Sequence, residues 1–148
     1  MQNPFKFLRP AEWELLIGKA EQRVYKPDEV ILKQGDKPSG IYIVQKGSAK
    51  VLRESFGFQI AIAEHGPGAI FGEMSFIEAE ITNTAVVAQE LCGVLIISHA
   101  VVQEIIGQNP GFYGRFFQSL AYILSQRLRN TTGMLGADGD SAWQKTNG

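Results

Sequence analysis

The stretch I-Y-I-V-Q-K-G-S-A-K-V-L, residues 41–52, contains two short runs of mostly apolar residues separated by a turn signal. Residues 41–44 are rich in β-branched side chains, as buried strands are, and residues 49–52 continue the same texture. Lys46-Gly47 lies between the two runs, where a glycine lets the chain turn tightly. We therefore predict two consecutive strands joined by a turn.

Runs of the same kind flank this pair on both sides. They are residues 30–32, 58–63, 84–88 and 94–97, and they are divided by Gly35-Asp36, Gly57 and Gly66-Pro67-Gly68. Six or more short strands, spaced by roughly ten residues, are typical of an antiparallel sandwich or barrel. The middle of the chain is thus predicted to be mainly β.

Helical periodicity is confined to the two ends of the chain. Residues 10–20 are predicted to form a short helix, with Pro10 in its first turn. Ser98 is a suitable N-cap for a second helix that ends near Gly107. A longer helix is expected from about Pro110 to Arg129. The expected plan is one helix, a β-barrel and two further helices.

Composition limits the class of protein. The chain has 148 residues, 45% hydrophobic and 20% charged, which suits one folded domain and excludes a disordered chain. We expect this domain to span residues 1–132, and the Gly-, Asp- and Thr-rich residues 133–148 to form a disordered tail. No apolar run is long enough to cross a membrane, so we expect a cytoplasmic protein without a membrane partner.

Charge is unevenly distributed along the chain. Residues 54–114 carry seven Glu and no Lys or Arg. A surface built from this segment would repel phosphates, and no basic recognition helix follows the long C-terminal helix. We therefore expect no nucleic-acid partner.

Catalytic and metal chemistry also lack a pattern. His65 and His99 are isolated from any ligand motif, and the double-histidine motif of cupin-type barrel enzymes is absent. Cys92 is the only cysteine, which excludes a disulfide framework and fits a small packed side chain. With no nucleophile–base arrangement visible either, the sequence predicts neither an enzyme nor a metal site.

One segment interrupts the strand pattern: F-G-E-M-S-F-I-E-A-E-I-T-N-T-A-V-V-A, residues 71–88, called the cassette below. It is predicted to turn at Gly72 into a single helical turn and to return to strand at Thr84. Such a helix start presents free backbone N–H groups, and Glu73 offers a carboxylate to sugar hydroxyls. An alternative is a structural turn in which Glu73 bonds nearby backbone amides.

Five motifs in order resemble those of the cyclic nucleotide-binding domain family. They are Tyr25-x-Pro27, Ile31-x-x-Gln34-Gly35-Asp36, Ile41-Tyr42-Ile43-Val44-x-x-Gly47, Gly66-x-Gly68 and Phe71-Gly72-Glu73-Met74-Ser75. The resemblance covers about residues 10–130. It implies an eight-stranded antiparallel β-roll, that is, a double-stranded β-helix or jelly roll, with one N-terminal and two C-terminal helices.

The resemblance also implies roles for individual residues. Glu73 would bind the ribose 2′-hydroxyl, and the backbone amides of Ser75 and Asn83 would face the cyclic phosphate. Val51 and either Ile60 or Ile62 would lie near the base. The candidate ligand-binding residues are Gly72, Glu73, Met74, Ser75, Thr82, Asn83 and Thr84.

The chain departs from the family pattern at Thr82, where the phosphate-binding arginine would stand. No Lys or Arg occurs between Arg53 and Arg115, so no shift of alignment supplies one. A hydrogen bond to a charged group contributes about 1.5–3 kcal/mol, roughly tenfold to over a hundredfold in affinity. We therefore expect weak or absent binding of cyclic AMP and cyclic GMP, and no fixed cofactor; a different small ligand is an alternative.

The long C-terminal helix has a wide apolar stripe. Phe116, Leu120 and Leu124 recur at intervals of four, and we expect this row to meet its symmetry mate in a homodimer through residues 110–129. The overall interpretation is a non-catalytic regulatory sensor or interaction module, with a further protein as a second kind of partner. The alternative is a truncated sensor domain of a catabolite-activator-type transcription regulator.

Overall fold

The computed structural model describes residues 2–147, and the side chains of residues 2–130. The strands are β1 (Glu21–Tyr25), β2 (Val30–Leu32), β3 (Ile41–Lys46), β4 (Ala49–Ser55), β5 (Phe58–His65), β6 (Ile70–Phe71), β7 (Ala85–Ala88) and β8 (Cys92–Ile97). The helices are α1 (Pro10–Lys19), α2 (Glu73–Glu78), α3 (His99–Gln108) and α4 (Phe112–Asn147).

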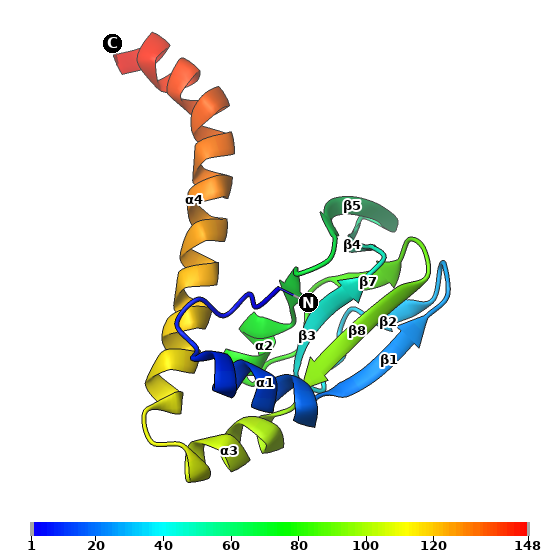
Figure 1. Ribbon diagram of the computed structural model, residues 1–148. Coiled ribbons are helices and arrows are strands. Elements are labelled where there is room, and N and C mark those ends of the chain that lie inside the picture. The colour runs from blue at the N-terminus through cyan, green and yellow to red at the C-terminus, as the bar shows by residue number, and fades with distance from the viewer. Residues whose placement is uncertain (1, 148) are drawn as a thin grey trace.

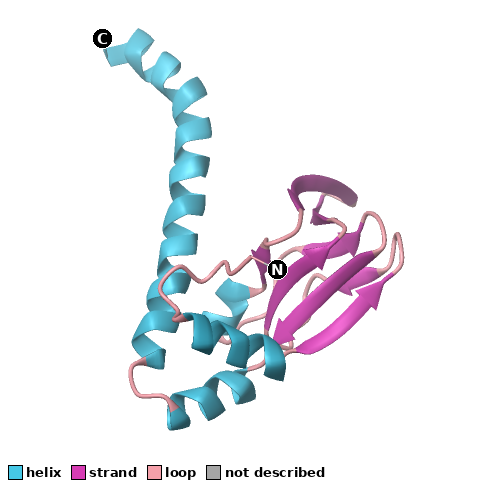
Figure 2. Ribbon diagram, in the orientation of Figure 1, coloured by secondary structure: helices cyan, strands magenta, loops and turns pink. Residues whose placement is uncertain are grey.

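The eight strands form two antiparallel sheets of four. Their orders are β1-β8-β3-β6 and β2-β7-β4-β5. Figure 2 shows the strands gathered on one side of the molecule and the helices on the other. The expected eight-stranded roll is confirmed, and it includes β1 and β6, which the hydrophobic pattern alone did not indicate.

Alternation along β3 divides the core into two clusters. Ile41 and Ile43 face the helices, where they pack with Trp13 and Leu16 of α1. The intervening side chains of β3 face the interior of the roll, together with Phe71 of the cassette. Successive side chains of a strand point to opposite faces, so one strand can serve both clusters.

The first two predicted helices begin where the sequence indicates, and the long last helix begins two residues later than expected. Ser98 caps α3 by accepting a hydrogen bond from the Val101 N–H at 3.2 Å. The last helix begins at Phe112 and not at Pro110, because Gly111 at φ +87° turns the backbone away from helical geometry first. In Figure 1, α4 extends well beyond the roll. α4 also runs to Asn147, past the expected helix end near Arg129. The division of the chain at residue 132 stays a prediction.

The expected dimer row is corrected by the packing of α4. Phe116 and Leu120 are fully buried within the single chain, against Phe5 and the roll. They therefore cannot form an exposed seam. The sequence showed that α4 has a wide apolar stripe, but the spacing of four did not say which part of it the roll covers.

Among residues 2–147, no helix combines the length and apolar character needed to cross a bilayer.

Candidate functional site

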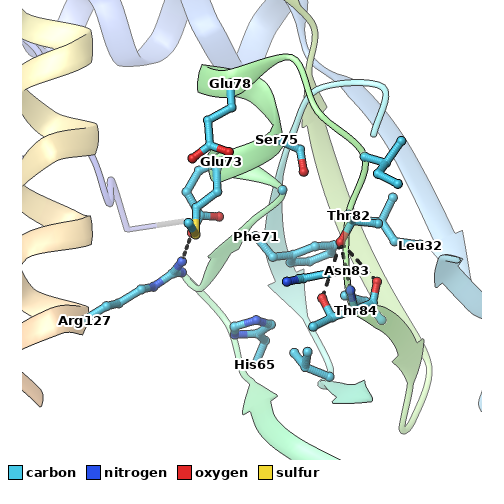
Figure 3. Close-up of a pocket in the computed structure, with 15 residues that line it drawn as sticks. Leu32, His65, Phe71, Glu73, Ser75, Glu78, Thr82, Asn83, Thr84 and Arg127 are labelled. Atoms are coloured by element: carbon cyan, nitrogen blue, oxygen red, sulfur yellow. Dashed lines mark hydrogen bonds and ion pairs between the residues drawn. The ribbon is translucent and has the colours of Figure 1, made fainter. Parts of the chain in front are cut away.

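A cavity of about 280 Å³ lies beside α2 and contains every ligand-binding candidate from the sequence. Its lining comprises Leu32, Val51, His65, Phe71, Gly72, Glu73, Met74, Ser75, Glu78, Ile81, Thr82, Asn83, Thr84, Val86 and Arg127. Figure 3 shows α2 on one side of this cavity and the segment from Thr82 to Thr84 on the other. The folded chain thus brings the two ends of the cassette together around one space.

Gly72 makes the sharp entry from β6 into α2. Its φ of +79° is a left-handed conformation that favours glycine. A Cβ at this position would also lie 3.0 Å from the carbonyl oxygen of Gly40 and 3.4 Å from the ring of Tyr42. Two independent constraints therefore place glycine here, and the predicted turn into a single helical turn is confirmed.

Thr82 shapes its own segment of the cavity wall. Its backbone N–H donates to the Asp36 carbonyl at 2.9 Å, and its carbonyl accepts from the Gly35 N–H at 2.8 Å. Its hydroxyl donates to the Thr84 carbonyl at 3.1 Å and lies 3.3 Å from the Thr84 N–H (Figure 3). The hydroxyl at the position of the missing arginine is therefore engaged within the cassette.

Glu73 is only 5% exposed and is held by an arginine from a distant helix. The Arg127 guanidinium donates to the Glu73 carboxylate and to the Ile70 carbonyl, and Figure 3 shows it reaching across from α4. The sequence reasoning that left the pocket without a cation is wrong, because it considered only the cassette and its neighbours in sequence. The alternative in which Glu73 is bonded by nearby backbone amides is not what the structure shows.

His65 forms part of the cavity wall at the end of β5. Its ring stacks on Phe71, with 5.5 Å between centroids and 7° between planes. Burial, and secondarily the charge of Arg127, lowers the pKa of His65 to about 4. The imidazole is therefore neutral at physiological pH, and it adds an uncharged aromatic ring to the cavity wall.

The cassette is also connected to the C-terminal helices. Phe76 of α2 is buried, and its ring stacks on His99, the first residue of α3, at 3.8 Å between centroids. The His99 Nε2–H donates to the Phe76 carbonyl at 3.0 Å, since a carbonyl oxygen can only accept. Phe76 also meets Phe116 of α4 edge to face. A shift of α2 would consequently disturb contacts with both helices.

Of the three residues expected near a ligand's base, one lines the cavity and two do not. Val51 lines the cavity as predicted. Ile60 and Ile62 are each 51% exposed on β5 and are not among the lining residues, and their place near a ligand's base stays a prediction. Arg127 and the aromatic role of His65 were missed, because neither carries a local pattern that links it to residues 71–88.

Comparison with known proteins identifies the family to which the fold belongs. A family model described as "Cyclic nucleotide-binding domain" matches residues 22–109. The chain belongs to this family. The Cyclic AMP receptor protein of Thermus thermophilus is 30% identical over 126 residues, which cover 84% of this chain and 56% of that protein. The Cyclic nucleotide-gated channel beta-3 of Canis lupus familiaris is 30% identical over 119 residues, 78% of this chain and 15% of that protein.

A solved structure of a similar protein has the same architecture. The crystal structure of Thermus thermophilus Catabolite Activator Protein superposes with a TM-score of 0.77 at 27% identity, covering 93% of this chain and 63% of that one. This chain therefore spans between one half and two thirds of these two bacterial relatives. The region shared with them includes the roll, the cassette and the start of α4.

Proposed function

We propose that this chain is a non-catalytic regulatory sensor that binds a small polar ligand in the cavity beside α2. One observation carries the proposal: all seven predicted ligand-binding residues line one cavity, with the carboxylate of Glu73 at its wall. Hydroxyl and amide groups from Ser75, Thr82, Asn83 and Thr84 surround the same space. Such a lining suits a ligand rich in hydroxyl groups, because each ligand hydroxyl can both donate and accept.

Ordinary cyclic nucleotides are proposed to bind weakly. The hydroxyl of Thr82 replaces a charged, bidentate group and is itself bonded to Thr84. Calorimetric titration with cyclic AMP and cyclic GMP tests this, and submicromolar affinity for either nucleotide would contradict it.

The sensor function is tested by native mass spectrometry of the purified full chain. We expect a retained small molecule, or one acquired from a nucleotide and nucleoside panel, that is lost when Ser75 is replaced by Trp to fill the cavity. The matched control is Ser48→Trp, because Ser48 lies outside the cavity lining. Equal retention of the molecule by both variants would place it elsewhere and contradict the proposed site.

A homodimer through α4 is the proposed assembly, with a seam revised from the sequence expectation. Phe117, Ala121, Leu124 and Leu128 follow a spacing of 4, 3 and 4, the repeat of a coiled-coil seam. Ala121 and Leu128 are exposed in the single chain, and Leu128 is 67% exposed. A second copy of α4 would cover this row without disturbing Phe116 and Leu120.

A second candidate function is the sensor domain of a catabolite-activator-type transcription regulator. The similarity to the Thermus thermophilus Cyclic AMP receptor protein favours it. We propose a cytoplasmic location for either function. An electrophoretic mobility assay with the natural full-length product and its own promoter region separates the two, since a stand-alone sensor would not retard the DNA.

A further inference from the structure

A second cavity, of about 400 Å³, lies between α4, the turn from β5 to β6 and the N-terminal segment, and is called the α4 cavity below. In Figure 1 the N-terminal segment runs between α4 and the strands. Of the described residues that line the α4 cavity, His65 and Arg127 also line the cavity beside α2, and none is a ligand-binding candidate from the sequence. Its volume is within the range of small-molecule sites. The α4 cavity is therefore a separate candidate for binding.

The walls of the α4 cavity are held in place by contacts elsewhere in the fold. Pro4 lines the cavity, and the segment that carries it is anchored on both sides. Phe5 is fully buried, and the Phe7 N–H donates to the Ser119 hydroxyl of α4 at 3.0 Å. In the turn from β5 to β6, the Gly68 N–H donates to a carbonyl of β3 at 2.8 Å. A ligand would thus enter a preformed site, and little ordering of the chain would oppose binding.

The lining of the α4 cavity combines apolar surface with one positive charge. Pro4, Ile70 and Ile123 supply aliphatic groups. Among the described lining residues, Arg127 is the one that is ionised at neutral pH, because the lowered pKa of His65 keeps its imidazole neutral. The cavity beside α2 differs, since Arg127 is accompanied there by two carboxylates. The α4 cavity therefore favours an apolar molecule with a negative charge.

Arg127 has N–H groups for a further partner. Among the described residues, it donates one N–H to the Glu73 carboxylate and one to the Ile70 carbonyl. An arginine carries five N–H donors, so three lie outside these two bonds, and the side chain is 38% exposed. Lys6 adds a second positive charge nearby, with its Nζ 4.3 Å from the centroid of the Tyr122 ring that lines the cavity. These charges attract an anion to the α4 cavity.

We propose that the α4 cavity binds a small carboxylic acid with an apolar body, whose carboxylate pairs with Arg127. A guanidinium can donate two parallel N–H groups to the two oxygens of a carboxylate. A carboxylate carries one charge, which one arginine can balance, whereas a phosphate monoester carries about 1.5 to 2 at neutral pH. Aliphatic walls also leave the hydroxyls of a sugar without partners. The assignment goes beyond the proposed sensor function and does not depend on a ligand beside α2.

The position of the site is tested by calorimetric titration of the full chain with octanoate. Gln126→Trp places a large ring in the α4 cavity from an exposed position and should weaken octanoate binding by at least about tenfold. Its matched control is Ser125→Trp, on an exposed neighbour outside the lining. Ser75→Trp, which fills the cavity beside α2, should leave the affinity for octanoate within about threefold.

The role of the charge is tested with octan-1-ol, which has the same chain and no carboxylate. Because Arg127→Gln alone would leave the buried Glu73 carboxylate unpaired, the variant is made in a Glu73→Gln background. There it should weaken octanoate binding by at least about tenfold and leave octan-1-ol binding within about threefold. Arg129→Gln removes the same charge from an exposed position of α4 and serves as the control. Circular dichroism confirms folding of each variant.

Methyl NMR of the unmodified protein gives a measurement that does not depend on any variant. Octanoate should shift the methyl resonances of Ile70 and Ile123, which line the α4 cavity, and leave that of Ile81, which lines the cavity beside α2. The reverse pattern would overturn the assignment. So would equal affinities for octanoate and octan-1-ol, or no binding of octanoate at millimolar concentration. Retention of a ligand beside α2 without octanoate binding would remove this site and leave the sensor proposal standing.

Discussion

Glu12 and Arg115, 103 positions apart, join the first and last helices by a two-point ion pair. The Arg115 Nε–H donates to one carboxylate oxygen at 2.8 Å, and a terminal N–H donates to the other at 2.6 Å. Glu12 is 2% exposed and also accepts from the Arg9 backbone N–H at 2.9 Å. The hydrogen bonds from Arg115, together with the one from Arg9, hold the pKa of Glu12 below its ordinary value of 4.5, although burial opposes the shift.

This pair predicts a dependence of stability on pH. Because the folded state lowers the pKa of Glu12, its contribution is fully present above 4.5 and fades as the pH falls through the folded-state pKa. Glu12→Gln should therefore reduce the free energy of unfolding at neutral pH. The difference in free energy of unfolding between this variant and the unmodified protein should become smaller as the pH falls. Urea denaturation across pH measures both effects. Glu14→Gln, an exposed change on the same helix, is the control, and an equal loss there would contradict the assignment.

Thr82→Arg should strengthen cyclic AMP binding by at least about tenfold, because it restores a charge-assisted pair to the phosphate. The new side chain sacrifices the hydroxyl bonds to Thr84, each worth about 1 kcal/mol in stability. Thr82→Gln loses the same bonds without adding charge and serves as the control. Calorimetry measures the affinity of both variants for cyclic AMP. Equal affinities would show that a phosphate bound in the cassette does not reach the side chain at position 82.

Leu124→Glu combined with Leu128→Glu should convert the proposed dimer into a folded monomer at micromolar concentration. A carboxylate buried in an apolar helix seam loses its hydration and destabilises the dimer far more than an exposed carboxylate does. Gln118→Glu with Ser125→Glu adds the same charge at exposed positions of α4 and should leave the dimer intact. Sedimentation velocity provides the measurement. A monomeric unmodified protein would remove the dimer proposal.

Two glycines with the same backbone conformation allow a test of crowding at the cassette. Gly72 and Gly57 have φ of +79° and +80°, but only Gly72 has neighbours within 4 Å of an added Cβ. Gly57→Ala should cost about 1–2 kcal/mol from left-handed strain alone. Gly72→Ala should cost about 1–3 kcal/mol more, because the Gly40 backbone must move. Chemical denaturation of both variants compares these costs, and equal losses would show that the space beside Gly72 adjusts freely.

Local pattern was enough to predict much of the architecture. The runs that became β2, β3, β4, β5, β7 and β8 are dense in apolar residues. The Ser98 cap, the Gly72 turn and the short α2 depend on residues adjacent in sequence. β1 and β6 were not indicated by that pattern. β1 has mostly exposed side chains and β6 has two residues, so each exists mainly through pairing with a distant strand.

The sequence by itself determined the fold class and the seven cassette residues at the candidate site, because alternation, turns and caps act over a few residues. Only the tertiary structure decided that Arg127 reaches Glu73, that Arg115 pairs with Glu12, and that Phe116 and Leu120 are core. These outcomes depend on how α4 rests against the roll. Helical periodicity defines the faces of α4 but contains no information about which face a distant surface will cover.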